Sequence, residues 1–284
     1  MNPQRRTIEA LKSLTVKTLW RALGRRNLVR LARFLSNESR LDCPNDMNRN
    51  GELMVQRGVL ANTSPSERLV VVDVGANVGD WSGALLDNAH RAGHTAVEIH
   101  CFEPAPAAYD KLVERFAGSE VKLVRAAASS KDGAGTLHLV SESAGINSLH
   151  ARADVAGAGS VAVKLQRLDS YCREQGIERI ALLKCDAEGH DFAVLSGARG
   201  LLARGAIDVV QFEYNWRWVD SRHFLRDVFE MIADLPYEVA KITPNAVEPY
   251  GRWDAELESY REANYVLLSE RARRWFPRIA WWND

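Results

Sequence analysis

Short apolar runs alternate with segments of helical spacing along most of this chain. The runs at residues 69–72, 97–102, 121–125, 180–183, 206–212, 237–242 and 263–268 predict seven strands. Between them, residues 105–116, 168–175, 192–202 and 221–235 predict helices. This alternation indicates an α/β fold, a mostly parallel seven-stranded sheet with helices on both faces. Two further runs, 136–140 and 161–165, predict an inserted β-hairpin around the long loop 141–160.

A helical extension is expected before this sheet, over residues 1–60. Leucines recur at helical spacing on both sides of a break near Gly24. The polar faces of these two helices are basic, because residues 1–40 hold ten Lys or Arg and two Glu. Such faces suit a cap packed on the rest of the protein, a lid, an acidic partner or a peripheral contact with an anionic membrane. Residues 43–58 are expected to form a polar connection.

A catalytic domain is expected over residues 61–270, followed by a Trp-rich tail at 271–284. The aromatic residues of the tail are Trp275, Phe276, Trp281 and Trp282. We expect them to pack on the body of the protein or on a second subunit of a homo-oligomer.

The composition narrows the possible partners and the compartment. Basic and acidic residues balance at 37 each, so no overall field attracts nucleic acid, and we expect no nucleic-acid partner. Four widely spaced cysteines, Cys43, Cys101, Cys172 and Cys185, form neither a zinc nor a disulfide pattern. No apolar run reaches the ~20 residues that span a bilayer, and no secretion signal is expected. We therefore expect a cytoplasmic protein.

The chemistry is expected around the stretch L-V-V-V-D-V-G-A-N-V-G at residues 69–79. It predicts a buried strand that ends near Asp73, a glycine turn and the start of a helix. Gly75 and Gly79 let backbone N–H groups approach a ligand without interference from a Cβ atom. The dinucleotide fingerprint has glycine at the position of Asn77, so NAD and FAD are disfavoured.

Acidic residues follow other strands of the predicted sheet at their carboxyl ends. Glu103, followed by Pro104, ends the second strand, where a carboxylate either accepts hydrogen bonds from two adjacent ribose hydroxyls or is simply exposed. The run D-A-E-G-H-D at residues 186–191 ends a later strand, and Glu213 ends the one after it. Because ligands of open α/β sheets bind outside the strand ends, we expect these carboxylates and Asp73 to meet at a common rim.

Five blocks together resemble a known family. They are D-V-G-A-N-V-G-D-W-S at 73–82, F-E-P-A-P at 102–106, V-K-L-Q-R-L-D-S at 163–170, L-K-C-D-A-E-G-H-D-F-A-V-L-S-G-A at 183–198 and Q-F-E at 211–213. In this order, over residues 50–270, the chain resembles the FkbM family of methyltransferases. The resemblance implies a Rossmann-like class I methyltransferase fold, S-adenosylmethionine as methyl donor, and O-methylation of a sugar or a glycosylated natural product. His190 departs from the family, which often has an acidic residue there.

The resemblance also assigns a cofactor site. Its residues would be Asp73, Gly75, Asn77, Gly79, Glu103, Pro104, Ala127 and Asp186. The adenine ring would lie at the turn 126–128, where many methyltransferases have an Asp or Asn. This chain has neither there, so backbone groups are expected to replace that side chain.

A hydroxyl acceptor must lose its proton as the new C–O bond forms. The candidates for the base are Asp186, Glu188, His190 and Glu213. His190 and Asp186 rank first, because imidazole titrates near neutral pH and Asp186 lies at the strand end. Alternatively, Asp186, Glu188 and Glu213 bind one Mg²⁺ ion that acidifies the hydroxyl. Glu188 or His190 could also merely cap the helix that follows.

Two other functions remain open from the sequence. One is an RNA 2′-O-methyltransferase, since Lys184, Asp186 and Glu213 loosely imitate a lysine and acid catalytic set, although the neutral net charge speaks against it. The other is a non-catalytic cofactor-binding protein, against which the intact acidic strand ends speak. For a small-molecule or glycan acceptor, specificity is expected in the loop 141–160 and in Trp216 and Trp218.

Overall fold

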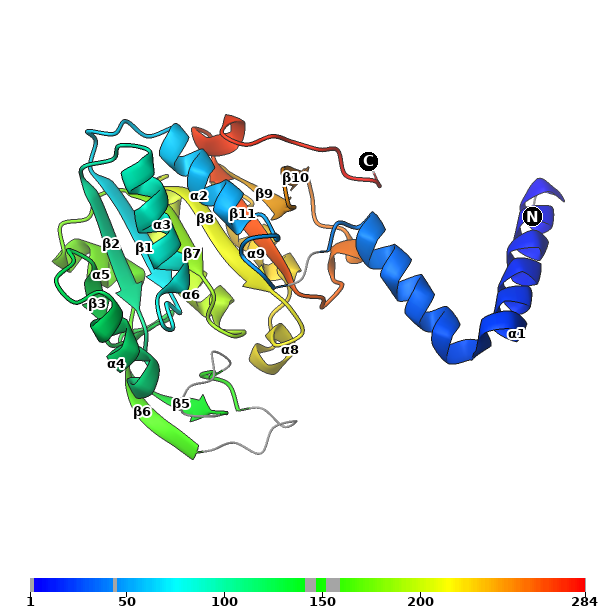
Figure 1. Cartoon of the computed structure of the whole chain (residues 1–284), viewed down its shortest axis with the longest axis horizontal. Coiled ribbons are helices and arrows are strands. Elements are labelled where there is room, and N and C mark those ends of the chain that lie inside the picture. Colours follow the sequence, from blue (N-terminus) through cyan, green and yellow to red (C-terminus); the bar gives the residue numbers. More distant parts are fainter. Residues whose placement is uncertain (1–2, 43–44, 141–146, 152–158, 284) are drawn as a thin grey trace. The chain divides into compact units, whose positions relative to one another are not determined.

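The computed structural model describes residues 3–42, 45–140, 147–151 and 159–283, and the chain divides into two compact units, residues 1–43 and 44–284 (Figure 1). The first unit contains the long helix α1 (Pro3–Ser39), which Gly24 interrupts with a non-helical backbone (φ 74°, ψ 156°). The break predicted near Gly24 is confirmed. Neither α1 nor any other helix in the described ranges combines the length and the apolar composition of a bilayer span. The cytoplasmic location stays a prediction.

A central sheet organises the second unit. In the described residues it has eight strands in the order β10-β9-β11-β8-β7-β1-β2-β3. They are β1 (Leu69–Val74), β2 (Val97–Phe102), β3 (Lys122–Val124), β7 (Ile180–Cys185), β8 (Ile207–Tyr214), β9 (Tyr237–Ile242), β10 (Val247–Tyr250) and β11 (Ala263–Ser269). The neighbouring strands β8, β7, β1, β2 and β3 pair in parallel, whereas β11, β9 and β10 add antiparallel pairs. The predicted α/β fold is confirmed, with the short edge strand β10 as an addition to the seven expected.

The register brings the carboxyl ends of the parallel strands to one edge of the sheet. Val74 at the end of β1 pairs with Phe102 in β2 and with Cys185 in β7. Cys185 in turn pairs with Phe212 in β8. The segments that leave β1, β2 and β7 therefore begin side by side.

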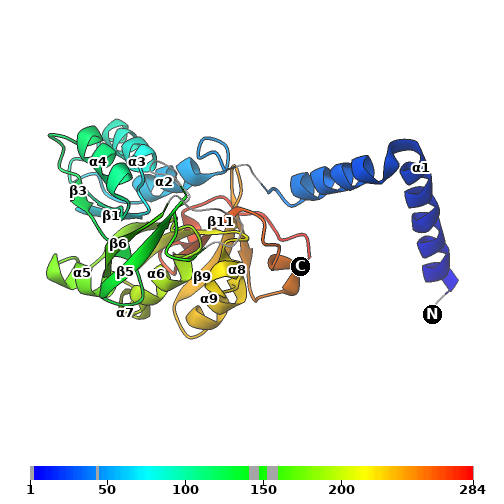
Figure 2. The ribbon, with the colours of Figure 1, turned by 90° about the horizontal axis from the view of Figure 1, so that it is seen from below.

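Helices cover both faces of this sheet (Figure 2). One face carries α2 (Glu52–Ala61), α3 (Asp80–Arg91) and α4 (Pro106–Arg115), and the other carries α5 (Leu168–Glu174), α6 (Asp191–Gly197), α7 (Arg199–Ala203) and α9 (Leu225–Ile232). Leu69 and Val71 of β1 pack in one buried cluster with α2 and α3, whereas Val70 and Val72 pack in another with α6 and α9. Two covered faces explain why β1 reads as an uninterrupted apolar run.

A second, three-stranded sheet has the order β4-β6-β5. Its strands are β4 (Ala127–Ala128), β5 (Gly133–Leu139) and β6 (Gly159–Gln166), and β5 and β6 form the predicted inserted hairpin. Of the loop 141–160, residues 141–146 and 152–158 lie outside the described residues. Residues 147–151 lie against β5, where His138 and Ser148 exchange two backbone hydrogen bonds.

The sequence predicted a polar connection over residues 43–58, but α2 begins at Glu52, so the prediction is wrong for residues 52–58. Val55 and Val59 of α2 are fully buried in the same cluster as β1. Residues 44–60 consequently belong to the second unit and not to the N-terminal extension. The sequence did not predict this helix because it has only ten residues and its buried face includes the polar residues Glu52 and Gln56, which interrupt the apolar pattern.

The C-terminal tail packs on the second unit. Phe276 is 5% exposed, and its ring occupies the space that a side chain at Gly58 would need. Trp281 makes an edge contact with Tyr250 at 5.5 Å between ring centroids, whereas Trp282 is 54% exposed. Packing on the body, one of the two alternatives from the sequence, describes most of the tail, and the homo-oligomer stays a prediction.

Phe276→Ala is expected to lower the free energy of unfolding by about 3–5 kcal/mol, because it leaves a cavity between the tail and α2. Urea denaturation measures this change. Trp282→Ala removes a larger, mostly exposed ring from the same tail and is expected to cost less than about 0.5 kcal/mol. Small effects of both substitutions would show that the tail does not pack on α2 in solution.

Candidate active site

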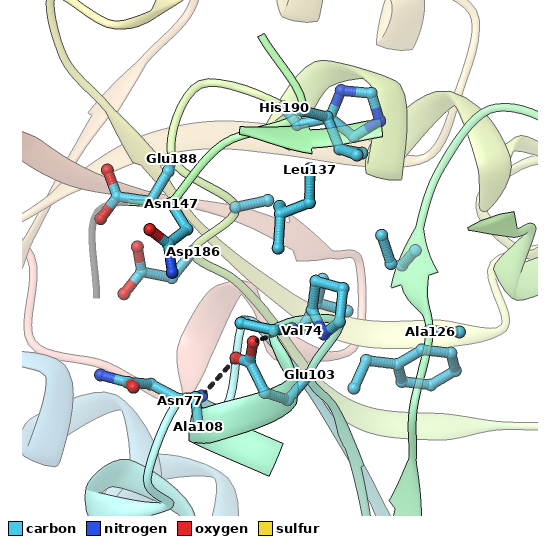
Figure 3. A pocket seen from close by; sticks show the side chains of 18 residues that line it. Val74, Asn77, Glu103, Ala108, Ala126, Leu137, Asn147, Asp186, Glu188 and His190 are labelled. Atoms are coloured by element: carbon cyan, nitrogen blue, oxygen red, sulfur yellow. Dashed lines mark hydrogen bonds between the residues drawn. The ribbon is translucent and has the colours of Figure 1, made fainter. Parts of the chain in front are cut away.

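A pocket opens to solvent at the carboxyl edge of the sheet, with about 580 Å³ of empty space that includes part of its open mouth (Figure 3). The small sheet and residues 147–151 supply part of its wall, including Leu137, Asn147 and Leu149. Predicted site residues in the lining are Gly75, Asn77, Glu103, Pro104, Ala127, Asp186, Glu188 and His190. The other three predicted residues, Asp73, Gly79 and Glu213, lie outside the lining.

The turn after β1 depends on a glycine at position 75. Gly75 has a φ of 76°, and a Cβ atom on it would lie 1.9 Å from the carbonyl oxygen of Asp186. The close approach of these two backbones shapes the floor of the pocket. Gly79 has a different task, because a Cβ atom there would meet Phe116 and Leu112, so it allows α3 and α4 to pack closely.

Glu103 faces the pocket and also fixes its walls. Its Oε2 accepts a hydrogen bond from the N–H of Asn77, and its Oε1 accepts one from the N–H of Ala105, both at 2.8 Å (Figure 3). Burial raises the pKa of Glu103 to about 7, although the two N–H donors favour its charged form. Each oxygen keeps a second lone pair for a ligand hydroxyl. Because the residue is 6% exposed, the alternative of a solvent-exposed strand-end carboxylate is wrong.

Lys184 links two of the predicted carboxylates, Asp186 in the pocket lining and Asp73 inside the sheet. Its ammonium group donates to Oδ2 of Asp186 at 3.1 Å and lies 3.6 Å from Oδ1 of Asp73. Burial alone would lower the pKa of Lys184, but Asp186 and Asp73 raise it above its usual value, so the group stays charged. Asp73 is fully buried and accepts a hydrogen bond from the Ser82 hydroxyl at 2.6 Å. It therefore supports the site from inside the sheet.

Glu52 is a buried carboxylate that the sequence reasoning missed. It begins α2 and accepts hydrogen bonds from the side-chain amides of Asn50 and Gln211, both at 2.7 Å. Burial raises the pKa of Glu52, and the charge of Lys184 opposes that effect. No sequence signal marks it, because a Glu in the first turn of a helix is expected to face solvent near the helix N-terminus.

Glu188 has a strained backbone at the edge of the pocket. Its φ of 54° lies in the left-handed region, which is uncommon outside glycine. Asp191 accepts hydrogen bonds from the N–H groups on both sides of it, Ala187 at 3.1 Å and Gly189 at 3.2 Å. The Ser148 hydroxyl donates to the Glu188 carbonyl oxygen at 2.8 Å. These contacts hold the turn in a conformation that the chain would otherwise avoid.

Burial and a neighbouring cation shift the pKa of the Glu188 carboxyl group in opposite directions. Burial raises the pKa of Glu188 to about 8, with a further contribution from Asp186. The guanidinium group of Arg217 forms an ion pair with Oε2 at 2.8 Å and opposes this shift. A carboxyl group with a pKa near neutral pH is suited to exchange a proton with a bound hydroxyl.

Both ring nitrogens of His190 are engaged within the protein. Nε2 lies 2.9 Å from the Ser129 hydroxyl, and Nδ1 lies 3.0 Å from Nε2 of His150. Burial, followed by the neighbouring His150 and His223, lowers the pKa of His190 to about 3. The ring is therefore neutral at neutral pH, and it must break a hydrogen bond before it can accept a proton from a ligand.

Glu213 lies close to this cluster but is enclosed. It is 3% exposed, and its Oε2 accepts a hydrogen bond from the Asn215 amide at 2.7 Å. Burial, with Asp186 next, raises the pKa of Glu213 well above its usual value. Across the described ranges, no three or more His, Cys, Asp or Glu side chains are grouped to hold a metal ion. The Mg²⁺ alternative therefore gains no support.

The residues expected to set acceptor specificity differ in their exposure. Trp218 is fully buried and donates to the carbonyl oxygen of Glu213 at 3.0 Å, so it offers no surface to an acceptor, and its role in specificity gains no support. Trp216 is 41% exposed and lies beside Arg217, whose guanidinium group is 5.4 Å from its ring centroid. From the loop 141–160, Asn147 and Leu149 line the pocket.

A comparison with sequence models of families matches the methyltransferase FkbM domain over residues 73–261, more than half of the chain. The chain belongs to the FkbM methyltransferase family. The family and the class I methyltransferase fold predicted from the sequence are confirmed. Glu52, at the start of α2, lies outside the matched range although it lies in the same buried network.

Two curated relatives of this FkbM protein are named methyltransferases. Methyltransferase sdnD of Sordaria araneosa is 32% identical over 160 residues, which cover 45% of this chain and 59% of the relative. The 2-O-methyltransferase NoeI of Sinorhizobium fredii is 26% identical over 149 residues, covering 48% and 59%. The chain thus spans less than two thirds of either relative.

A solved structure of a putative rRNA methylase from Clostridium thermocellum covers 78% of this FkbM chain and 98% of its own. The TM-score is 0.43 and the identity is 10%. At this similarity, no function is transferred from it.

The pocket of this FkbM protein fits S-adenosylmethionine in its chemistry. The Gly75 turn leaves room for a ligand beside the backbone, and Glu103 offers oxygens to two adjacent hydroxyls. Ala127 and Leu137 supply an apolar wall for a flat ring. Asp186 and Glu188 lie together on another side of the pocket, and carboxyl groups there suit a sulfonium cation (Figure 3).

Gly75→Ala is expected to lower the free energy of unfolding by about 3 kcal/mol, because it adds backbone strain and a clash with Asp186. Gly93→Ala is a matched control, since Gly93 has a similar φ of 78° but open space around it. That control is expected to cost about 1 kcal/mol from strain alone. Equal costs in urea denaturation would show that the two backbones do not approach as described.

The stability of Glu188→Gln relative to the wild type is expected to increase as the pH rises. The folded state raises the pKa of Glu188 from 4.5 to about 8, so it binds this proton more tightly than the unfolded state does. Wild-type stability therefore falls as the pH rises through this window, and the variant lacks that loss. The difference in unfolding free energy, from urea denaturation at about pH 5 and about pH 8, should widen by about 1 kcal/mol or more.

Glu120→Gln removes the same charge at an exposed position of the second unit and controls for net charge. A stability difference that stays constant with pH in Glu188→Gln would contradict the raised pKa.

Proposed function

We propose that this protein transfers a methyl group from S-adenosylmethionine to a hydroxyl group of a sugar or of a glycosylated small molecule. The observation that carries the proposal is the pocket itself, in which a glycine turn and Glu103 adjoin the acidic turn of Asp186 and Glu188. The relative named a 2-O-methyltransferase supports a hydroxyl as the acceptor. Membership of the FkbM family supports the methyl transfer.

One part of the pocket, formed by Glu103, the Gly75 turn, Ala127 and Leu137, would bind and orient the cofactor. Of the residues that line it, Glu103 would accept hydrogen bonds from the ribose hydroxyls, the Gly75 turn would adjoin the amino acid end, and Ala127 and Leu137 would hold the adenine ring. When bound, S-adenosylmethionine supplies an activated methyl group on a positively charged sulfur. Asp186, held by Lys184, places a negative charge on that side of the pocket.

Glu188 is the base in this proposal. It would accept the hydroxyl proton as the acceptor oxygen bonds to the methyl carbon, the carbon–sulfur bond breaks and S-adenosylhomocysteine leaves. Arg217 would stabilise the carboxylate before that transfer. The pKa of about 8 matches this task, whereas His190, with a pKa lowered to about 3 and both nitrogens engaged, is a weaker choice. Asp186 is the second candidate, since it lines the same side of the pocket (Figure 3).

The strained turn also argues against a protein that binds the cofactor without chemistry. Left-handed backbone at a non-glycine residue costs of order 1–3 kcal/mol and concentrates at functional sites. Three side chains, those of Asp191, Ser148 and Arg217, are committed to holding Glu188 there. A carrier of the cofactor alone would not need this arrangement.

Glu188→Gln is expected to reduce methyl transfer to the preferred acceptor of a panel of methyl glycosides by about 10²–10⁴-fold, because the amide cannot accept the proton. Its affinity for S-adenosylhomocysteine, measured by calorimetric titration, should stay close to that of the wild type. Asp186→Asn is expected to lose transfer in the same way. Asp220→Asn, an exposed position outside the pocket lining, should leave both quantities unchanged.

The outcomes separate the parts of the proposal. Full activity of Glu188→Gln would place the base elsewhere, with Asp186 next. A wild-type protein that binds no S-adenosylhomocysteine would refute the assigned cofactor. Transfer to RNA with no transfer to any glycoside would replace the proposed acceptor class.

A further inference from the structure

Most of the exposed large apolar side chains among the described residues lie in the first unit. Among the described residues, nine of the fifteen exposed large apolar side chains lie on α1, from Leu14 to Leu35. Trp20 is 52% exposed and Phe34 is 58% exposed. The second unit is much longer and has five such side chains. A concentration of this kind marks an interaction surface.

The half of α1 after Gly24 has two distinct faces. Leu28, Leu31 and Leu35 follow each other at helical spacing and share one face. Positions 26, 30 and 33, all arginine, share the opposite face by the same spacing. Apolar and basic side chains thus lie on opposite sides of one helix.

The charge of this region selects the kind of partner. Residues 1–40 hold ten Lys or Arg and two Glu, although the whole chain is neutral. A second copy of the chain would bring an equally basic helix against this one, and like charges repel. An anionic lipid surface instead offers phosphates to the basic side and acyl chains to the apolar side.

We propose that α1 binds along the surface of an anionic lipid bilayer. Leucines and the rings of Trp20 and Phe34 enter the boundary between headgroups and acyl chains, and the arginines contact lipid phosphates. The break at Gly24 lets each half of the helix turn its own apolar side toward the lipid. This proposal does not depend on the reaction, because its readout is lipid binding.

The test is sedimentation of the full chain with vesicles of phosphatidylcholine that contain about a quarter phosphatidylserine. Binding is expected to be at least about tenfold tighter than to phosphatidylcholine alone and to weaken as the salt concentration rises. Replacing Arg26, Arg30 and Arg33 together by Glu should weaken it by at least about tenfold. Glu is nearly as good a helix former as Arg, so α1 keeps its helix, which circular dichroism checks.

A matched variant separates this surface from net charge. Replacing Arg91, Lys131 and Arg252 together by Glu makes the same change of charge at exposed positions of the second unit and should leave vesicle binding unchanged. Replacing Leu31, Phe34 and Leu35 together by Ser should abolish binding through loss of the apolar contact.

Three results would overturn the proposal. The first is equal sedimentation with and without phosphatidylserine. The second is a loss of binding in the control variant as large as in the α1 charge variant. The third is a wild-type dimer in light scattering that the Ser variant dissociates, without any vesicle binding, which would assign the apolar face to a second copy of the chain.

Discussion

The buried ammonium group of Lys184 ties the central sheet to the chemistry at its edge. Lys184 and Asp73 are register partners on the adjacent strands β7 and β1, and the other contact of the ammonium group, Asp186, lines the pocket. Buried charges are tolerated when they are paired, so the three side chains have to be positioned together. Their pairing fixes how β1 and β7 end, and it brings Gly75 against the backbone of Asp186.

The positions of the strands along the chain, the glycine turn and the acidic turn after β7 were predictable from the sequence, because apolar periodicity and glycine are strong local signals. The direction in which each acid faces was not. The apolar runs predicted that β1 ends before Asp73 and that β8 ends before Glu213. In the structure the two strands continue to Val74 and Tyr214. These two acids therefore lie within the sheet and are buried, whereas Glu103 and Asp186 follow their strands and reach the pocket.

The remaining parts of the site depend on contacts between distant segments, which no local pattern reveals. Glu52 comes from a short helix before β1 and meets Gln211 of β8. The preference for His190 as a base followed from its ordinary pKa, but Ser129 and His150 take up both ring nitrogens. The strain at Glu188 follows from Asp191, three residues later, whose carboxylate binds the backbone on both sides.

The short segment at residues 147–151 has two roles that cannot vary separately. Asn147 and Leu149 form part of the pocket wall, while Ser148, between them, bonds to the carbonyl oxygen of Glu188. The segment belongs to the insertion between β5 and β6, the kind of region in which homologues differ most in length and sequence. Divergence of this insertion would reshape the pocket wall and shift the acidic turn at the same time. A change in substrate preference would therefore leave the turn intact only where a hydrogen-bond donor remains at position 148.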